Sequence, residues 1–143
     1  MIRHNIRAAV FAVILALSVP AVALAADASG KARVVFQVSD ADPAKWNLAL
    51  NNIKNVQTDL GAANTEVEIV AYGPGIGMLK ADATIANRVI DAMAQGVKVV
   101  ACENTMTNQK IKREDMIDKI SYVKAGVVEL MQKQREGWAY IRP

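Results

Sequence analysis

The stretch that decides the fold is VKVVACENTM, residues 97–106. It begins as a short, valine-rich apolar run, which is typical of a strand buried on both faces of a parallel sheet. The run ends at Cys102, the only cysteine in the chain, and the sequence then turns polar. Because open parallel sheets bind ligands at the carboxyl ends of their strands, this position makes Cys102 the best candidate for chemistry.

Two similar apolar runs precede this stretch. Residues 33–38 (RVVFQV) and 67–72 (VEIVAY) are predicted to be buried strands, and a predicted helix follows each of them. The first helix spans residues 43–60, with Asp42 in the N-cap position and proline as its first residue, and the second spans residues 84–95. Two successive strand–helix–strand units predict a parallel sheet that is covered by helices and has right-handed connections.

The C-terminal part of the chain has a weaker pattern. The polar segment 107–119 predicts one or two short helices, one of them starting near Thr105, and residues 120–123 predict a short strand. Residues 125–136 predict a final helix, and residues 138–141 (WAYI) predict a last strand. The residues expected on the inner face of that helix are Val127, Val128 and Met131. The predicted fold class is therefore α/β, a single-domain parallel sheet of about five strands flanked by helices on both faces.

Residues 1–25 are typical of a secretory signal peptide, and we expect the folded domain to span residues 31–143. Two arginines precede an uninterrupted apolar run, and residues 23–25 (ALA) have the small-x-small form of a cleavage site. The alternative is an uncleaved membrane anchor, but a serine and a proline interrupt the apolar stretch near its end. Cleavage predicts a periplasmic or secreted protein that has no membrane partner.

Removing the signal peptide leaves a chain with nearly balanced charge, because two of the 17 basic residues lie in it and all 14 acidic residues lie outside it. Nucleic-acid binding needs a clustered excess of Lys and Arg, so we predict no nucleic-acid partner. The only histidine, His4, is also removed. The mature chain then has no Ser-His-Asp or Cys-His pair and lacks the commonest zinc ligand, so we predict no metal and no cofactor.

A single cysteine has no partner for a disulfide within the chain, so Cys102 is buried and inert, paired between molecules, or a free reactive thiol. A helix beginning just beyond it would lower the thiol pKa through the helix dipole and the free backbone N–H groups. Basic residues on the same connection could add positive potential, whereas Glu103 acts against it; these basic residues are Lys110, Lys112 and Arg113. Alternatively, Cys102 packs as a small hydrophobe at the end of a core strand. The residues alone leave both interpretations open.

Gly73, Gly75 and Gly77 form a glycine-rich connection after the second predicted strand. The connection does not match the Walker pattern GxxxxGK, and the dinucleotide fingerprint would need a glycine where Lys80 stands. A looser nest of backbone donors for an anion is one interpretation. The interpretation we favour is a turn that needs positive φ angles, the usual role of glycine in a connection.

Two pairs of acidic residues complete the candidates. Asp40 and Asp42 follow the first predicted strand, where they could act as a carboxylate pair, but helix capping explains Asp42 and solvation explains Asp40. Glu66 and Glu68 alternate at the start of the second predicted strand. We expect both glutamates to be solvated and assign neither pair a catalytic role.

Together, four segments of the chain resemble the DsrE/DsrF-like family, and in particular its exported members. The segments are VVFQVSD (34–40), VEIVAYGPGIGML (67–79), VVACENTM (99–106) and AGVVELMQKQREGWAYIRP (125–143). The resemblance covers residues 31–143. It implies a parallel sheet flanked by helices, in which a cysteine at the end of a central strand accepts sulfane sulfur as a persulfide. It also implies assembly as homo- or hetero-oligomers such as trimers and hexamers, and for this chain we expect a homo-oligomer (trimer or hexamer).

By this resemblance Cys102 accepts the sulfur, and the protein acts as a sulfur carrier more than as a turnover enzyme. Its partner is then a sulfur donor or acceptor protein. The chain departs from the sulfur-relay members in its signal peptide and in having no nearby histidine or second cysteine. The alternative function is a non-catalytic oligomeric module that binds a small ligand or anion at the glycine-rich and cysteine loops. Its candidate ligand-binding residues are Gly75, Gly77, Glu103, Asn104 and Thr105. A thiol–disulfide oxidoreductase is disfavoured because the chain has no CxxC motif.

Overall fold

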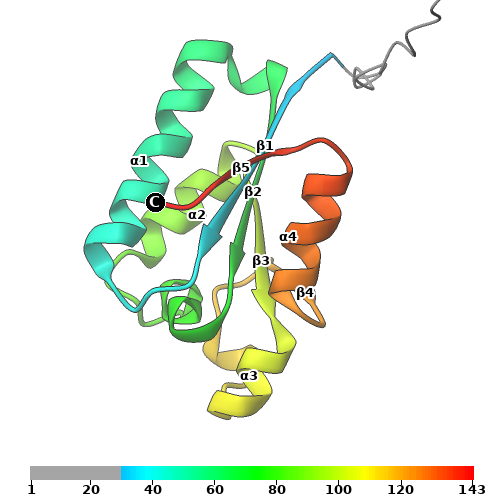
Figure 1. Cartoon of the computed structure of the whole chain (residues 1–143). Helices are drawn as coiled ribbons and strands as arrows, with labels where there is room; N and C mark the ends of the chain where they lie inside the picture. The colour runs from blue at the N-terminus through cyan, green and yellow to red at the C-terminus, as the bar shows by residue number, and fades with distance from the viewer. Residues whose placement is uncertain (1–29) are drawn as a thin grey trace, which may run out of the picture.

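The computed structural model describes residues 30–143, and in this part of the chain five parallel strands form one sheet in the order β4-β3-β2-β1-β5 (Figure 1). The strands are β1 (Ala32–Val38), β2 (Thr65–Ala71), β3 (Lys98–Cys102), β4 (Ser121–Val123) and β5 (Ala139–Ile141). The predicted signal peptide, residues 1–25, lies outside the described residues. Within them, no helix combines the length and hydrophobicity needed to cross a membrane.

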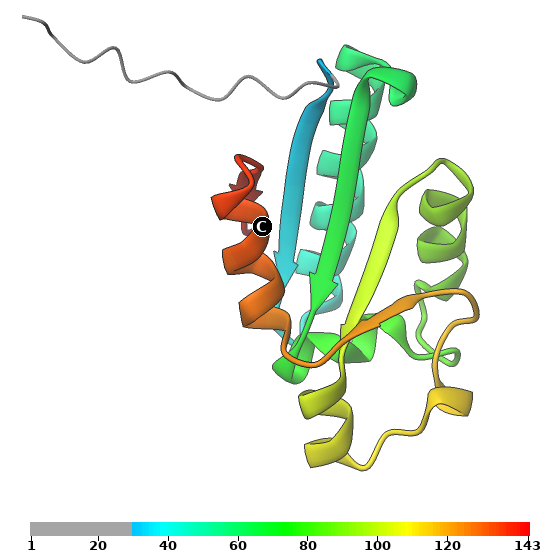
Figure 2. The same cartoon turned by 90° about the vertical axis from the view of Figure 1, so that its right-hand side faces the viewer.

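Helices cover the two faces of the sheet unequally. α1 (Pro43–Leu60) and α2 (Ala86–Ala94) pack on one face, and α4 (Gly126–Arg135) packs on the opposite face (Figures 1 and 2). The short helix α3 (Glu103–Gln109) extends from the end of β3. Three 3-10 helices lie in the connections: η1 (Ala62–Asn64), η2 (Gly73–Leu79) and η3 (Arg113–Asp115). The α/β class with helices on both faces of a parallel sheet is as predicted.

The core is divided by the sheet into a large and a small part. The large part lies under α1 and α2, where β-branched and aromatic strand residues such as Phe36 and Ile69 meet the apolar stripe of α1. The predicted N-cap of that helix is confirmed, because the Asp42 carboxylate accepts a hydrogen bond from the Ala44 backbone N at 2.8 Å. The small part lies under α4 and consists of Val35, Val70, Val100 and Leu130.

Register brings the connections that follow the strands to one edge of the sheet. Val38 of β1 is paired with Ala71 of β2, and Ala71 with Ala101 of β3. Cys102, the last residue of β3, is paired with Val123, the last residue of β4. Because all these strands are parallel, the loop after each one starts beside the loop after its neighbour.

α4 packs with a different face from the one predicted. Val127, Val128 and Met131 were expected to point inward but are 52%, 46% and 57% exposed, whereas Gly126 and Leu130 are buried. The absence of a side chain at Gly126 lets the helix approach β2 closely, since a Cβ there would lie 3.0 Å from the Cβ of Tyr72. The prediction failed because α4 carries apolar residues on two sides, so its hydrophobic pattern does not specify a single inner face.

The expectation that Glu68 is solvated was wrong. Glu68 is fully buried in the middle of β2, on the face that α4 covers. Lys98 is its register partner on β3, and the Lys98 Nζ lies 3.0 Å from the Glu68 Oε2. A buried charge needs such a partner, and this pairing was not predictable from the sequence because the two residues are far apart along the chain.

Candidate functional site

Cys102 lies at the junction of a central strand and a helix. It is the last residue of β3 and the N-cap of α3, which begins at Glu103, two residues earlier than predicted. The first backbone N–H groups of α3 have no partners within the helix, and they point toward the end of β3; that of Asn104 donates to the Lys124 oxygen, beside the sulfur. The residue as a whole is 5% exposed, which places it just beneath the surface at the end of the sheet.

Hydrogen-bond donors surround the sulfur. Burial raises the pKa of the Cys102 thiol, but hydrogen bonds outweigh it, so the pKa lies below its ordinary value of 9.0. The donors are the Thr105 hydroxyl and the backbone N–H groups of Gly126, Thr105 and Asn104. The carbonyl oxygen of Lys124 lies 3.9 Å from the Sγ and accepts from the protonated thiol. These surroundings stabilise the thiolate more than a site lined by aliphatic side chains would.

Thr105 links the sulfur to the glycine-rich connection. Its side chain is buried, and its Oγ1 accepts a hydrogen bond from the Gly73 backbone N at 2.9 Å. Because that contact uses the oxygen as an acceptor, the hydroxyl hydrogen remains available to the sulfur. Gln109, one turn further along α3, donates from Nε2 to the Gly73 oxygen at 3.1 Å. The connection after β2 is therefore attached to α3 through Gly73 at two points.

The connection between β4 and α4 forms the other side of the site, and our sequence reasoning missed it. The Asn104 backbone N donates to the Lys124 oxygen at 3.1 Å, and the Gly126 N–H reaches the sulfur of Cys102. The first turn of α3 and the connection into α4 therefore meet beside the sulfur, which lies 3.9 Å from the Lys124 oxygen. The signal that could have revealed it is strand order, because a strand placed beside β3 must start its next connection next to Cys102.

Glu103 does not leave an uncompensated negative charge beside the thiol. Its Oε1 lies 2.6 Å from the Nη2 of Arg113, whose guanidinium also lies over the ring of Tyr122, 4.2 Å from the centroid. Lys112, expected to add positive potential, pairs instead with Glu114 at 3.6 Å. The main support for a Cys102 thiolate therefore comes from hydrogen bonds and not from nearby cations.

Gly75 and Gly77 pack against β1 and α1 and do not contact the sulfur. A Cβ on Gly75 would lie 2.4 Å from the Val38 carbonyl oxygen, and a Cβ on Gly77 would lie 3.3 Å from the Trp46 ring. Of the three glycines in the connection, Gly73 has a positive φ angle, 53°. The expected positive-φ turn is thus found at Gly73, while Gly75 is explained by the close approach of two backbone segments.

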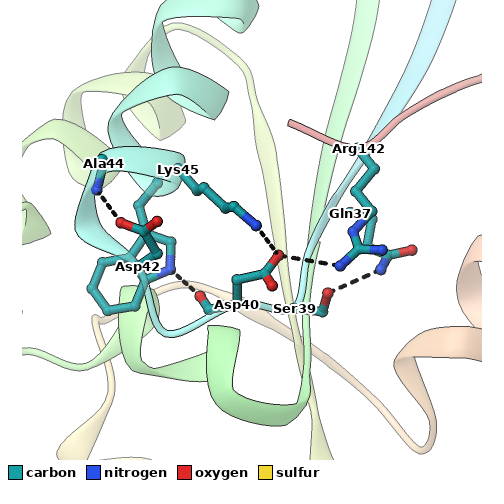
Figure 3. Close-up of polar contacts among 8 residues, drawn as sticks. Gln37, Ser39, Asp40, Asp42, Ala44, Lys45 and Arg142 are labelled. Carbon is teal, nitrogen blue, oxygen red and sulfur yellow. Dashed lines mark hydrogen bonds and ion pairs between the residues drawn. The ribbon is translucent and has the colours of Figure 1, made fainter.

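Asp40 and Asp42 do not form a carboxylate pair. Figure 3 shows the Asp42 carboxylate turned toward the start of α1, while the Asp40 carboxylate lies between Lys45 and Arg142, 3.3 Å from each. The hydrogen bond from Lys45 lowers the pKa of Asp40. These ion pairs lie beside the carboxyl ends of β1 and β5, where strand order reverses and parallel sheets often bind ligands. The cavity there is about 10 Å³, room for about one water molecule.

Larger cavities lie elsewhere on the surface. A groove of about 420 Å³ runs along α3 and is lined by Glu103, Thr107 and Lys110 among others. The largest, about 760 Å³, lies between α2 and residues 114–119 and includes none of the groups that hydrogen-bond the sulfur. In the described residues, no group of three or more His, Cys, Asp or Glu is arranged to hold a metal ion.

Comparison with known proteins places this site in context. The model of the DsrE/DsrF-like family matches residues 31–143. The protein of unknown function MTH1491 from Methanobacterium thermoautotrophicum is 34% identical, with a TM-score of 0.76, over 79% of this chain and 100% of that one. No curated protein matches the chain significantly.

Two further solved structures share the fold at low identity. The conserved protein of unknown function BT1422 from Bacteroides thetaiotaomicron is 12% identical, with a TM-score of 0.64, over 78% of this chain and 94% of that one. The ychN protein from E. coli is 15% identical, with a TM-score of 0.60, over 79% of this chain and 99% of that one. At these identities the likeness concerns the fold alone.

Proposed function

Because the chain belongs to the DsrE/DsrF-like family, we propose that Cys102 accepts sulfane sulfur as a persulfide and passes it to a second protein. The observation that carries this proposal is the set of hydrogen-bond donors around a thiol at the end of a central strand. A thiolate is the form of cysteine that attacks sulfur, and these donors favour it. The family, whose characterised members are generally sulfur-relay proteins, supplies the substrate class.

The chemistry consists of two sulfur transfers without a net redox change. The Cys102 thiolate attacks the outer sulfur of a donor persulfide, R–S–SH; the donor S–S bond breaks, and a new S–S bond forms on Cys102. The donor leaves as its thiolate, R–S⁻. An acceptor thiolate then attacks the outer sulfur of the Cys102 persulfide and takes it, which restores the Cys102 thiolate. A lowered thiol pKa assists this second step, because a more acidic thiol is a better leaving group.

The test of this proposal is sulfur loading of the purified mature protein. We expect treatment with inorganic polysulfide to raise the intact mass of the wild type by one or more sulfur atoms, and dithiothreitol to remove them. Cys102→Ser should gain none, because the chain has no other cysteine. A wild type that stays unchanged in mass, or equal loading of Cys102→Ser, would remove the proposal.

The burial of Cys102 is the observation that favours the rival function, a non-catalytic module that binds a small ligand or anion. At 5% exposure the thiol is accessible only through a narrow opening or a small local movement. The rate of alkylation by iodoacetamide separates the two functions. A sulfur carrier should react in the native state with single-exponential kinetics, whereas an inert packing thiol should react only after denaturant is added.

Self-assembly is a separate part of the proposal, supported by an apolar surface on α4. This surface consists of Val127, Val128 and Met131, three of the most exposed large hydrophobic residues among those described. Contact with a second copy would bury it, through a head-to-tail interface in a trimer or additionally through a two-fold interface in a hexamer. We expect an oligomer, a trimer or hexamer by family resemblance, and we expect Met131→Glu to lower its mass in light scattering. Gln132→Glu, the same change of charge at a neighbouring exposed polar position, should not; a monomeric wild type would contradict assembly.

Export of the protein to the periplasm or outside the cell is also a proposal. It rests on the composition of residues 1–25, two arginines before an apolar run and a small-x-small site. Sulfur transfer would then take place with an extracytoplasmic donor or acceptor. N-terminal sequencing of the protein recovered from the periplasm tests it, because an intact Met1 there would contradict cleavage.

A further inference from the structure

The face of the sheet under α4 holds a cluster of charged side chains that the proposed sulfur chemistry does not use. Its centre is the buried Glu68 of β2, whose Oε2 lies 3.0 Å from the Lys98 Nζ on β3 and 3.8 Å from the Lys133 Nζ on α4. Glu129, also on α4, lies 3.9 Å from Lys98 and 3.8 Å from Lys133. The cluster therefore joins β2, β3 and α4.

Residues at the end of α4 complete the surroundings of Lys133. Its Nζ lies 3.5 Å from a Glu136 carboxylate oxygen and 4.6 Å from the centroid of the Trp138 ring. Arg33 of β1 approaches the same ring at 5.7 Å and donates to the Glu136 backbone oxygen. Lys133 is thus enclosed, with 16% of its side chain exposed, and its position is fixed by contacts from several elements.

Hydrophobic burial alone does not determine how α4 is rotated about its own axis. The inward face holds Gly126 and Leu130, whereas the outward face holds the apolar surface defined above. A helix with apolar groups on both sides can exchange one face for the other at a modest cost in burial. The Glu68–Lys133 ion pair distinguishes the two orientations, because turning the helix over would remove Lys133 and leave the Glu68 carboxylate buried beside fewer cations.

The orientation of α4 decides whether its first backbone N–H reaches the cysteine. Gly126 and Lys133 are seven residues apart, which is about two helical turns, so they lie on the same face of α4. At one end of that face Lys133 meets Glu68. At the other end the connection into α4 lies against Cys102, whose Sγ is 3.9 Å from the Lys124 oxygen, and the Gly126 N–H lowers the thiol pKa. A rotation or tilt of the helix moves both ends together.

We propose that Glu68 is a positioning residue for Cys102: by holding Lys133 of α4 against the sheet, it fixes the rotation of α4 that directs the Gly126 N–H at the sulfur. The proposal rests on the proposed function of Cys102 as a thiolate. Glu68 itself does not touch the sulfur, since the four residues from its register partner Lys98 to Cys102 span about 13 Å of β3.

Energetics support alignment rather than stability as the role of Glu68. Burial raises the pKa of Glu68, the Lys98 ammonium opposes this, and the Glu129 carboxylate raises it further. A carboxyl group whose pKa is raised by folding stabilises the fold below its unfolded pKa and loses that contribution as the pH rises through the folded value. Keeping Glu68 ionised in this buried position therefore costs free energy, as expected of a buried ion pair that specifies one arrangement.

The experiment measures the thiol pKa of Cys102 in Glu68→Gln, using ultraviolet absorbance of the thiolate and the pH dependence of iodoacetamide alkylation. We expect the pKa to rise and the alkylation rate at pH 7 to fall about three- to tenfold, since one pKa unit is a tenfold change in thiolate. The midpoint of thermal unfolding should stay equal to the wild type or increase. Glu66→Gln removes a carboxylate two residues earlier on β2 and serves as the matched control, with both values unchanged.

The direction in which the Cys102 pKa shifts in Glu68→Gln distinguishes a positioning role of Glu68 from a direct electrostatic effect of its charge. Removing the negative charge of Glu68 would by itself stabilise the Cys102 thiolate and lower its pKa, and at this distance screening makes that effect small. A rise in the pKa therefore requires a change in geometry. A pKa in Glu68→Gln that equals or lies below the wild-type value overturns the inference, whereas an ordinary thiol pKa in the wild type itself contradicts the proposed function.

A second pair of variants gives an answer even if Glu68→Gln does not fold. Lys133→Met and Lys98→Met each remove one cation from Glu68. Lys133 belongs to α4, whereas Lys98 belongs to β3, the strand of Cys102, and approaches α4 through the longer 3.9 Å contact with Glu129. If Glu68 acts through α4, Lys133→Met raises the thiol pKa more than Lys98→Met does. An equal or larger effect of Lys98→Met, the cation on the strand of Cys102, overturns the inference.

Discussion

Gly75→Ala is expected to destabilise the protein by about 3 kcal/mol, the upper part of the range for overpacking. The new Cβ would lie 2.4 Å from the Val38 oxygen, 2.6 Å from the Val38 carbon and 2.8 Å from the Ser39 Cα. All three are backbone atoms at the end of β1, so no side-chain rotation relieves the clash and the connection after β2 must move away. The midpoint of thermal unfolding should fall by roughly 10 °C.

Gly77→Ala is the matched control, since it adds the same methyl group two residues later. There the nearest atom is the Trp46 Cη2 at 3.3 Å, the end of a side chain that can shift by a few tenths of an ångström. We expect a loss of about 1 kcal/mol or less. Equal losses for the two variants would show that the close contact between Gly75 and β1 is not what requires glycine there.

Gly75→Ala should also weaken the hydrogen bonding around Cys102. Gly73 lies two residues before Gly75 in η2, and its backbone N–H is the group that orients the Thr105 hydroxyl. A shift of the connection would disturb this contact and raise the pKa of Cys102. In a folded preparation of Gly75→Ala, alkylation of the thiol at pH 7 should therefore be slower than in Gly77→Ala.

The fold was predictable because its signals are local. Each of the first three strands is a short run of β-branched residues, and each of the first two helices begins and ends within a few residues of its predicted limits. The rotation of α4 was not predictable, because its apolar residues lie on two sides and the choice depends on Glu68 and Lys133. Such a pair is invisible to periodicity, since its members are far apart in sequence.

The cysteine site was predictable only in part, for the same reason. The position of Cys102 at a strand end and the helix after it follow from adjacent residues, as do Asn104 and Thr105. The Gly126 N–H and the Gly73 contact come from other connections and depend on strand order. Sequence patterns predict the elements but not which loops meet, so one of the four donors to the sulfur, Gly126, and the contact that orients the Thr105 hydroxyl required the structure.

Thr105→Val is expected to slow alkylation of Cys102 at pH 7 about tenfold by raising the thiol pKa about one unit. Valine has the shape of threonine but lacks the hydroxyl that donates to the sulfur, so burial would dominate the remaining backbone donors. The change also leaves the Gly73 N–H without its acceptor, which costs about 1–3 kcal/mol if it stays buried. Sulfur loading from polysulfide should slow in the same proportion as alkylation.

The pH dependence of the free energy of unfolding gives an independent measurement of the lowered thiol pKa of Cys102. Cys102 has a pKa lowered by folding, so it stabilises the fold above its unfolded pKa, and this contribution is lost as the pH falls through the folded value. Relative to Cys102→Ser, the free energy of unfolding of the wild type should therefore increase with pH up to about the ordinary value of 9.0. In Thr105→Val this increase should be smaller or absent.

Two further variants of α3 decide whether the hydroxyl itself is responsible. Thr105→Ser keeps the hydroxyl and should retain most of the wild-type alkylation rate. Thr107→Val removes another hydroxyl from the same helix. That hydroxyl donates to the Glu103 carbonyl oxygen at 2.9 Å and not to the sulfur, so the pKa of Cys102 should be unchanged in this variant. If Thr105→Val and Thr107→Val give the same thiol pKa, the Thr105 hydrogen bond does not stabilise the thiolate, and the backbone donors alone must account for it.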